Sequence, residues 1–365
     1  MARTSPSLAA SLSECMFRAA QEHIPEIQEL LGKAPSALIG TIAHAVVDRA
    51  LRFADLPLSS GQGQGRQAIA RQLWEEEEEN LIRSLPPVAL PEPARWPHYA
   101  MKRARTCALA ASLLHGSTEK ERRLSPFPPH FLTSEVEFQA CDGRLAGRID
   151  HLVRTEEGLV VEDLKTGEIR DDGGKLIDVY RRQVLIYAFL VHENLGEWPS
   201  SVRLVSVNGD SLEQSIEPNE SIRLVETVLR DLTRYNQVAS SLEGDAPAQM
   251  RTLAAPSPEA CRWCRVRAWC APYWEVKGDW PNANPSRADV GGILAQDWTS
   301  GQSMQLGLEG NLREITLGVL PLHVAGGPSN LPKGTRIRCL RARVVQEDKT
   351  FHADLYAELW WEGTI

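Results

Sequence analysis

The sequence predicts an α/β domain followed by a small all-β domain. The first hundred-odd residues place apolar side chains at helical spacing, which predicts helices. From about Phe131 the apolar side chains alternate with polar ones, as they do in half-buried strands. Beyond Pro285 the chain consists of short alternating runs between glycine turns. A length of 365 residues agrees with two or three domains, and the first is long enough to bury a sizeable core.

The individual elements follow from these periodicities. The first helices are expected at residues 36–51, 67–84 and 101–115. Strands are expected at residues 132–138, 144–153 and 158–165, with turns at 141–143 and 155–158. The remaining elements of this domain are a helix at 178–194, a strand at 202–207 and a helix at 220–242.

Acidic residues outnumber basic ones by 48 to 40, which gives a net charge of −8. Five of the acidic residues form one block, Glu75 to Glu79, on an expected helix. Five adjacent carboxylates cannot all be paired, so we expect this block to be a solvated face. Because the acidity is mostly local, it does not exclude a nucleic-acid partner, which would need a basic groove rather than a basic protein.

The composition excludes membrane-spanning, collagen-like and largely disordered proteins. Apolar residues make up 42% and charged residues 24% of the chain, as in soluble globular proteins. No stretch reaches the ~18 uninterrupted apolar residues of a membrane span, and residues 1–13 lack the pattern of a signal peptide. We therefore expect a cytoplasmic protein without a membrane partner. The sequence contains no G-x4-G-K-[ST] loop, so it is not expected to couple ATP hydrolysis to unwinding.

The segment from Gly147 to Gly167 carries the most informative pattern, D-x12-D-x-K. If Thr155 to Gly158 form the turn, antiparallel pairing places Asp150 directly opposite Asp163, with Lys165 on the same face. Two facing carboxylates destabilise a sheet unless a cation neutralises them, and oxygen ligands favour Mg²⁺ or Mn²⁺. A cation, an activated water and an ammonium form a hydrolytic set. The alternative is an ordinary surface hairpin with acidic and basic side chains.

Two helix faces add further polar groups. Gln183 and Tyr187 lie four residues apart and share one face of a helix, with Arg182 beside them. They supply an amide, a phenol and a cation that could contact phosphate or the attacking water. Gly40 and His44 share a helix face in the same way, and a neutral imidazole can be a metal ligand. A single histidine on a helix is also compatible with an ordinary surface or core position.

The motifs G-x3-H, D…D-x-K and Q-x3-Y, in this order, resemble the RecB-like branch of the PD-(D/E)XK nuclease superfamily over roughly residues 8–275. The resemblance implies a restriction-endonuclease-like core, which is a mixed central sheet flanked by helices. The metal ligands that it implies are His44, Asp150, Asp163 and the backbone carbonyl of Leu164. The catalytic residues that it implies are Asp150, Asp163, Lys165, Gln183 and Tyr187. A glutamate before the first hairpin strand often joins such sites, and Glu135 and Glu137 both qualify.

Three of the seven cysteines form a cluster, Cys261-x2-Cys264-x5-Cys270, which indicates metal ligation in a reducing compartment. Cys15 is the candidate for a fourth ligand. This arrangement resembles AddB and the CRISPR-associated RecB-like nucleases, which hold a [4Fe–4S] cluster by one early and three late cysteines. Four thiolates can hold zinc instead. In either case the site would join the two ends of the nuclease domain. Alternatively, the C-x2-C pair is a coincidence. The remaining cysteines are expected to be ordinary buried thiols; they are Cys107, Cys141 and Cys339.

The expected domain division is a nuclease domain at 1–280, a linker at 281–289 and a β domain at 290–365. In the last of these, residues 334–346 alternate as a half-buried strand with a basic outer face, and residues 351–361 form another strand. A small barrel with arginines and exposed aromatic residues resembles an OB-fold, which binds single strands. Its arginines could also merely solvate an edge, or the unit could dock another protein. The candidate nucleic-acid-binding residues are Arg182, Arg336, Arg338 and Trp360.

Together these features predict a metal-dependent deoxyribonuclease that uses Mg²⁺ or Mn²⁺. By resemblance, its substrate is single-stranded DNA or frayed DNA ends, and it acts as an exonuclease in repair, CRISPR adaptation or antiphage defence. A separate helicase would supply the strand. The alternative function is that of a non-catalytic nucleic-acid-binding scaffold subunit of a helicase–nuclease or defence complex.

Overall fold

The computed structural model forms two compact units. One comprises Met1–His23, Lys33–Ser84 and Ala100–Ala255, and the other comprises Ile24–Gly32, Leu85–Tyr99 and Pro256–Ile365. The residues that the structure describes are 1–25, 27–28, 34–53, 63–85, 92–114, 131–171, 173–242, 246–262, 264–280, 284–308, 313–319, 329–347, 349–354 and 356–361. The expected linker at 281–289 lies partly outside them. The predicted domain division stays a prediction, and the packing groups residues 256–280 with the C-terminal strands.

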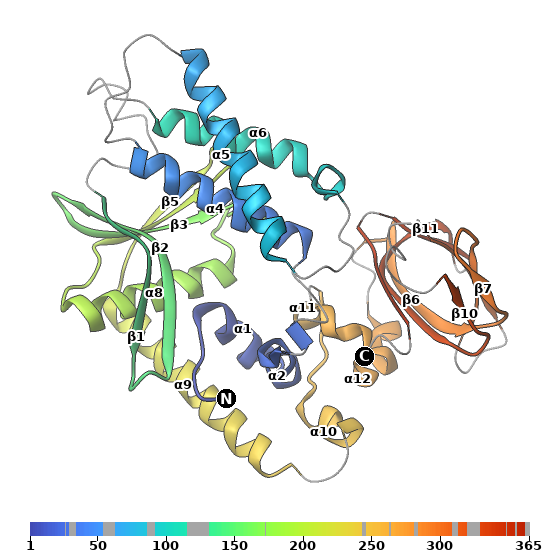
Figure 1. Ribbon diagram of the computed structural model, residues 1–365. Helices are drawn as coiled ribbons and strands as arrows, with labels where there is room; N and C mark the ends of the chain where they lie inside the picture. Colours follow the sequence, from blue (N-terminus) through green and yellow to red (C-terminus); the bar gives the residue numbers. More distant parts are fainter. Residues whose placement is uncertain are drawn as a thin grey trace. The chain divides into compact units, whose positions relative to one another are not determined.

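A five-stranded mixed sheet forms the centre of the N-terminal unit (Figure 1). Its strands, in spatial order, are β1 (Phe131–Ala140), β2 (Leu145–Thr155), β3 (Gly158–Lys165), β4 (Ser201–Ser206) and β5 (Ser211–Ser215). Only β3 and β4 pair in parallel, and the other neighbours are antiparallel. The predicted strands and the predicted mixed sheet are thus confirmed. The edge strand β5 was not predicted, because its polar sequence carries no apolar run.

Helices cover both faces of this sheet. The crossover between the parallel strands is α8 (Asp178–Leu195), which packs with α9 (Pro218–Ser240) against one face. Figure 1 shows α4 (Pro35–Phe53), α5 (Gly63–Ser84) and α6 (Tyr99–Leu113) on the other side. The short helices α1 (Pro6–Glu14), α2 (Met16–His23) and α10 (Ala246–Leu253) complete the unit. Among the described residues, no helix is long and apolar enough to cross a membrane.

The core follows from the alternation of the strands. The side chains that pack between the sheet and α8 and α9 are fully or almost fully buried; they include Leu152, Leu159, Val161, Val184, Leu190, Val202, Leu204, Val225 and Val228. Burying aliphatic side chains of this size contributes about 1.5–3 kcal/mol each. This core holds the strands that carry the aspartates in a fixed register.

The five glutamates of the block on α5 make more contacts than the sequence predicted. Glu75 lies 2.7 Å from Arg103 on α6, and Arg49 on α4 contacts both Glu76 at 2.8 Å and Glu77 at 2.7 Å. Within α5, the remaining two glutamates contact Trp74 at 3.2 Å and Arg83 at 3.6 Å. Most of the block is solvated as predicted, since the side chains of Glu75, Glu76 and Glu79 are 65%, 41% and 71% exposed. The pairing of Glu75, Glu76 and Glu77 was not predicted, because the cations lie on neighbouring helices that are distant in sequence.

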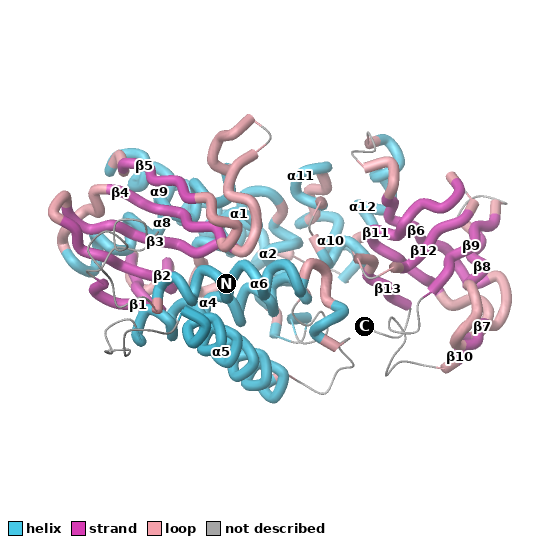
Figure 2. The backbone as a smooth tube through the Cα atoms, turned by 90° about the horizontal axis from the view of Figure 1, so that it is seen from above, coloured by secondary structure: helices cyan, strands magenta, loops and turns pink. Residues whose placement is uncertain are grey.

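The C-terminal unit is a small β barrel, whose strands carry the labels β6 to β13 in Figure 2. Its strands are β6 (Arg287–Leu294), β7 (Trp298–Thr299), β8 (Met304–Gly307), β9 (Glu314–Val319), β10 (Asn330–Leu331), β11 (Arg336–Gln346), β12 (Thr350–Ala353) and β13 (Glu358–Trp361). Five of them close a ring in the order β6-β8-β9-β12-β11, with β9 and β12 parallel. The predicted single strand at 351–361 was wrong, because a turn at Tyr356 divides it into β12 and β13.

The three-cysteine segment packs within this C-terminal unit. It consists of α11 (Pro258–Cys261), η2 (Arg265–Ala268) and α12 (Ala271–Val276), followed by η3 (Lys277–Asp279). The carboxylate of Asp289 on β6 accepts hydrogen bonds from Arg267 at 2.6 Å and from the Tyr273 hydroxyl at 2.6 Å. It also accepts one at 2.7 Å from the N–H of Arg341, which has a left-handed φ of 59° at a bulge in β11. Asp289 therefore joins the cysteine segment to the barrel.

Candidate active site

The β2–β3 hairpin has the register that the sequence predicts. Thr155 pairs with Gly158 across the turn, and His151 pairs with Glu162. Continuing that register by one residue sets Asp150 opposite Asp163. The Asp150 carboxylate accepts a hydrogen bond from the backbone N–H of Leu164 at 2.8 Å, so it reaches across to β3. The two aspartates are almost completely buried, at 9% and 1% exposed.

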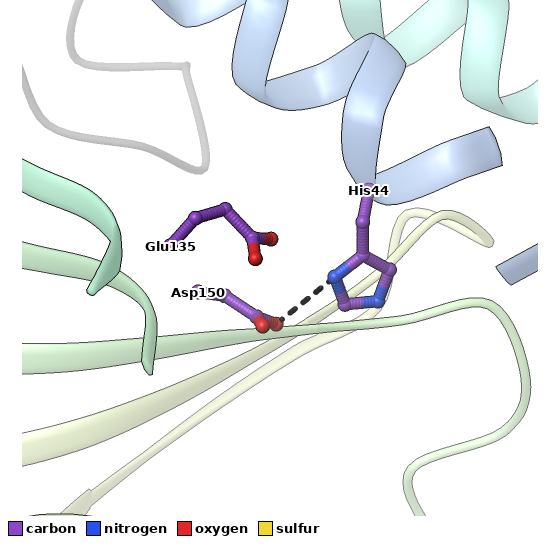
Figure 3. Close-up of side chains that lie close together, drawn as sticks. All are labelled: His44, Glu135 and Asp150. Carbon is purple, nitrogen blue, oxygen red and sulfur yellow. Dashed lines mark ion pairs between the residues drawn. The ribbon is translucent and has the colours of Figure 1, made fainter. Parts of the chain in front are cut away.

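A possible metal-binding group lies around Asp150 (Figure 3). His44, Glu135 and Asp150 each offer a ligand atom, and these atoms lie within 4.8 Å of one another. His44 projects from α4 toward the sheet, and its Nδ1 lies 3.3 Å from Asp150 Oδ2. Glu135 comes from β1 and has a left-handed φ of 52°, which is costly for a residue with a side chain. Of the two glutamates that qualified, Glu135 joins this group, whereas Glu137 lies 3.5 Å from Arg3.

The pKa of each of these side chains depends on the charge of its neighbours. Burial opposes charge on His44, but its hydrogen bond to Asp150 and the nearby aspartates outweigh burial and raise its pKa. Burial likewise opposes charge on Asp150, but His44 and the Leu164 N–H lower its pKa overall. Burial and the charge of Asp150 both raise the pKa of Glu135. Concentrated negative charge of this kind favours a bound cation.

Lys165 is held next to the aspartates by several contacts. Its Nζ lies 2.5 Å from Asp163 Oδ2 and donates a hydrogen bond to Gln183 Oε1 at 2.9 Å. Gln183 in turn donates to the Tyr187 hydroxyl at 3.0 Å. The Lys165 ammonium also lies 4.8 Å from the centre of the Tyr180 ring. The motif residues of β3 and α8 thus form one connected network. Their spacing predicted the shared face within each element, and the family resemblance predicted that the helix pair lies beside the aspartates.

The charge of Asp163 depends on its surroundings. Burial and the neighbouring Asp150 raise the pKa of Asp163 to about 6, although Lys165 acts in the opposite direction. Burial and nearby carboxylates also raise the pKa of Tyr187 above its ordinary value, so its hydroxyl stays protonated. Gln183 therefore connects the Lys165 ammonium to a neutral phenol on α8.

A cavity of about 520 Å³ opens beside this group. It is lined by Ala37, Gly40, Thr41, His44, Ala45, Asp48, Glu135, Arg148 and Asp150. Two of these residues, Asp48 and Arg148, were missed in the sequence. Asp48 lies one helical turn after His44, and Arg148 lies two residues before Asp150 on the same strand. Helical and strand periodicity could have found both.

The remaining candidate residues lie elsewhere. Arg182 is directed to the Ser13 hydroxyl on α1, at 3.2 Å. In the C-terminal unit, the Arg338 guanidinium lies 4.4 Å from the centre of the Trp274 ring, and Trp360 packs edge-on against Trp269 at 4.8 Å. Arg336 is exposed at the start of β11. The nucleic-acid-binding role of these four residues stays a prediction.

All four cysteines of the expected cluster site are buried. Three of them, Cys261, Cys264 and Cys270, lie in the C-terminal unit. There the Cys264 N–H donates to the Cys261 carbonyl at 3.2 Å, and the Cys264 carbonyl accepts a hydrogen bond from the Arg267 guanidinium at 2.7 Å. In the N-terminal unit, Cys15 Sγ accepts a hydrogen bond from the N–H of Ala255, the last residue of that unit, at 3.5 Å.

Comparison with known proteins identifies a family. The model of the PD-(D/E)XK nuclease superfamily matches residues 3–271. No curated protein matches the chain. Among solved structures, 11 chains match. One is described as "Crystal structure of SSO0001"; it is 14% identical, the match covers 62% of this chain and 94% of that chain, and the TM-score is 0.23.

Proposed function

The chain belongs to the PD-(D/E)XK nuclease superfamily, and from that premise we propose that it is a metal-dependent deoxyribonuclease acting on single-stranded or frayed DNA ends. The observation that carries the proposal is that His44 from α4 and Asp150 from β2 lie together at one cavity, while Asp150 also bonds to the backbone of β3, the strand that carries Asp163 and Lys165. A scaffold protein has no need to collect these groups, since buried like charges are costly without a partner.

We assign the metal to His44, Asp150, Asp163 and the backbone carbonyl of Leu164, with Glu135 as an additional ligand. The donor set supports His44, Asp150 and Glu135, whose ligand atoms lie within 4.8 Å of one another, whereas Asp163 and the Leu164 carbonyl are assigned by the family resemblance. Oxygen-rich sites of this kind suit Mg²⁺ or Mn²⁺. When bound, such a cation supplies positive charge against the phosphate and lowers the pKa of a coordinated water.

The protein groups would orient and stabilise the reacting phosphodiester. Lys165 is poised by Asp163 and Gln183 to place an ammonium against the negative charge that develops on the phosphate. Gln183 and Tyr187 would orient that ammonium through their own hydrogen bond. Attack of a water molecule on the phosphorus, in line with the leaving 3′ oxygen, would break the bond to that oxygen and give a 5′-phosphate end. We assign the catalytic roles to Asp150, Asp163, Lys165, Gln183 and Tyr187.

We further propose that Cys15, Cys261, Cys264 and Cys270 hold a [4Fe–4S] cluster, with zinc as the alternative occupant. The chemistry of the donor set supports this, because four cysteine side chains can ligate such a cluster and all four are buried. The N–H of Ala255, the last residue of the N-terminal unit, donates a hydrogen bond to the sulfur of Cys15. The cluster would be structural rather than a carrier of electrons.

For the C-terminal unit we propose an OB-fold. Its ring order and the parallel pair β9 and β12 support this, because the OB-fold is a five-stranded Greek-key barrel. The biological setting that we propose is DNA repair, CRISPR adaptation or antiphage defence, with a separate helicase supplying single strands.

The decisive experiment for the nuclease is digestion of end-labelled single-stranded DNA with Mg²⁺ or Mn²⁺. We expect Lys165→Ala to lower the rate by at least about 10²-fold. Lys175→Ala, at an exposed lysine of the same unit, is the matched control and should leave the rate unchanged. Equal activity of wild type and Lys165→Ala would remove the catalytic assignment. No activity in any of the three proteins would favour the scaffold function.

The cluster has a separate test in protein purified without oxygen. We expect a brown protein with iron and sulfide, and a bleached, less stable one after Cys264→Ser. Cys141→Ser, at a half-buried thiol outside the set, should keep its colour. Stoichiometric zinc without iron would contradict the cluster and leave the nuclease proposal standing.

A further inference from the structure

A second cavity of about 310 Å³ lies beside the proposed metal site. Arg148 on β2 lines both cavities, so the two adjoin along the β1–β2 hairpin. In the first cavity Arg148 faces an acidic group and lies 3.5 Å from Glu135. The second cavity is different, because it also contains Arg3 and His23 and has Glu137 as its acidic side chain.

The N-terminal segment builds one wall of this second cavity. Thr4 forms a bridge beside the start of β2, since its N–H donates to the Arg144 carbonyl at 2.8 Å and its carbonyl accepts from Ala146 at 3.1 Å. Thr4 is only 2% exposed, so this segment is fixed in place. Ser5 then caps α1 by accepting a hydrogen bond from the N–H of Leu8 at 3.2 Å.

The fixed backbone sets Arg3 at the mouth of the cavity. Its guanidinium lies 3.5 Å from Glu137, and both side chains are about half exposed, at 58% and 47%. An exposed ion pair of this length contributes little to stability. Arg3 is therefore available to a stronger anion, and a phosphate offers better hydrogen-bonding geometry to a guanidinium than a distant carboxylate does.

The change of charge between the two cavities matches the chemistry of a nucleic-acid strand. The scissile phosphate needs a cation from the carboxylate-lined cavity, whereas every other phosphate of the strand needs direct contacts from basic side chains. Phosphate contacts fix the register of a strand without reading its sequence. The second cavity, of about 310 Å³, has the size of a small-ligand site. It can hold a single nucleotide but not a double helix.

We propose that the second cavity is a phosphate subsite for the nucleotide next to the scissile bond, formed by Arg3, His23 and Arg148. The proposal rests on the nuclease function proposed above and deepens it. It assigns to this site a single strand that runs along the β1–β2 hairpin from one cavity into the other. Glu137 opposes the phosphate and limits its affinity.

The test measures binding of a fluorescent single-stranded oligonucleotide to the Lys165→Ala protein in EDTA, at several salt concentrations. We expect Arg3→Ala to weaken binding about fivefold or more and to reduce the salt dependence by about 0.7 in log–log slope. Arg3→Lys should restore much of the affinity, because it keeps the charge.

Two more variants separate a subsite from a general loss of charge or of folding. Glu137→Gln should strengthen binding, since it removes the opposing carboxylate, and a misfolded protein would not bind more tightly. Arg154→Ala is the matched control: Arg154 is an exposed arginine on β2 that pairs with Glu197 at 2.7 Å and lies outside both cavities. It should bind as the parent does.

The outcomes distinguish this subsite from the nuclease proposal. Equal affinities of the parent, Arg3→Ala and Arg154→Ala would overturn the subsite, and so would an equal loss in both arginine variants. If the otherwise wild-type protein does not cleave DNA but Arg3→Ala still weakens binding selectively, the nuclease proposal fails, and the second cavity remains a phosphate-binding site without a scissile bond beside it. If the wild-type protein cleaves DNA and the Arg3→Ala variant cleaves it with the same KM, the subsite alone fails.

Discussion

The two units of this protein treat buried carboxylates in opposite ways. In the C-terminal unit, Asp289 has a donor for each oxygen: Arg267 and Tyr273 on one, and the Arg341 N–H on the other. In the N-terminal unit, carboxylate oxygens of Asp150 and Glu135 lie within 4.8 Å of each other, and the neighbouring Asp163 has a raised pKa. The first arrangement is a single carboxylate surrounded by donors, whereas the second gathers three carboxylates, whose partners are Arg148, His44 and Lys165.

This difference separates a structural role from a functional one. A buried carboxylate with complete partners fixes the geometry of its surroundings and offers nothing to a ligand. Carboxylates that repel one another are held together only because the core beneath them is strong, and they gain most from a cation. Three predictions follow from this contrast between Asp289 and the group around Asp150.

The largest effect is expected on stability. Asp289→Asn leaves the Arg267 guanidinium, which is 4% exposed, without its carboxylate, and should destabilise the C-terminal unit by about 3–5 kcal/mol. Glu135→Gln in metal-free protein should instead raise stability by about 0.2–1 kcal/mol, because it removes a repulsive neighbour of Asp150. Denaturant unfolding in EDTA measures both. A comparable loss in the two variants would mean that both carboxylates are structural.

The second effect is stabilisation by a cation. At a Mg²⁺ or Mn²⁺ concentration about 100 times its Kd, the N-terminal unit should gain about 2.7 kcal/mol. His44→Ala should lose most of this gain, while His352→Ala, at an exposed histidine of the other unit, should keep it. Thermal unfolding with and without the cation checks this. An equal shift in both variants would place the cation outside the group around Asp150.

Much of the N-terminal unit could be predicted because its signals are local. The turn at 155–158 fixes the register of the hairpin, and that register alone places Asp150, Asp163 and Lys165 together. Helical spacing likewise placed Gln183 beside Tyr187, and their hydrogen bond follows from that spacing.

The features that could not be predicted depend on backbone geometry or on distant segments. Glu135 and Glu137 have the same strand parity, and only the left-handed φ of Glu135 distinguishes them. The cations that pair with the glutamate block lie on other helices, as Arg49 and Arg103 do. Asp289 gave no sequence signal, because its partners are a buried arginine and a bulge on another strand.

The last prediction concerns the pH dependence of the metal-free protein. Burial raises the pKa of Asp163 to about 6, against the influence of Lys165. It raises the pKa of Glu162 to about 8, against the influence of Arg203. A raised carboxyl pKa means that the folded state binds the proton more tightly than the unfolded state. The resulting stability is complete below about pH 4, where the unfolded carboxyls titrate, and is lost as the pH rises through 6 and 8.

Asp289 has the opposite sign, because Arg267 and the other donors overcome burial and lower its pKa. Its contribution to stability is present above about pH 4 and is lost only on further acidification. Between pH 5 and 8 in EDTA, hydrogen exchange corrected for intrinsic rates should therefore show decreasing protection in β3 and constant protection in β6. Mg²⁺ should restore β3, and Glu162→Gln should reduce its pH dependence. Parallel losses in β3 and β6 would contradict the contrast, since both units would then respond to one common process rather than to their own buried carboxylates.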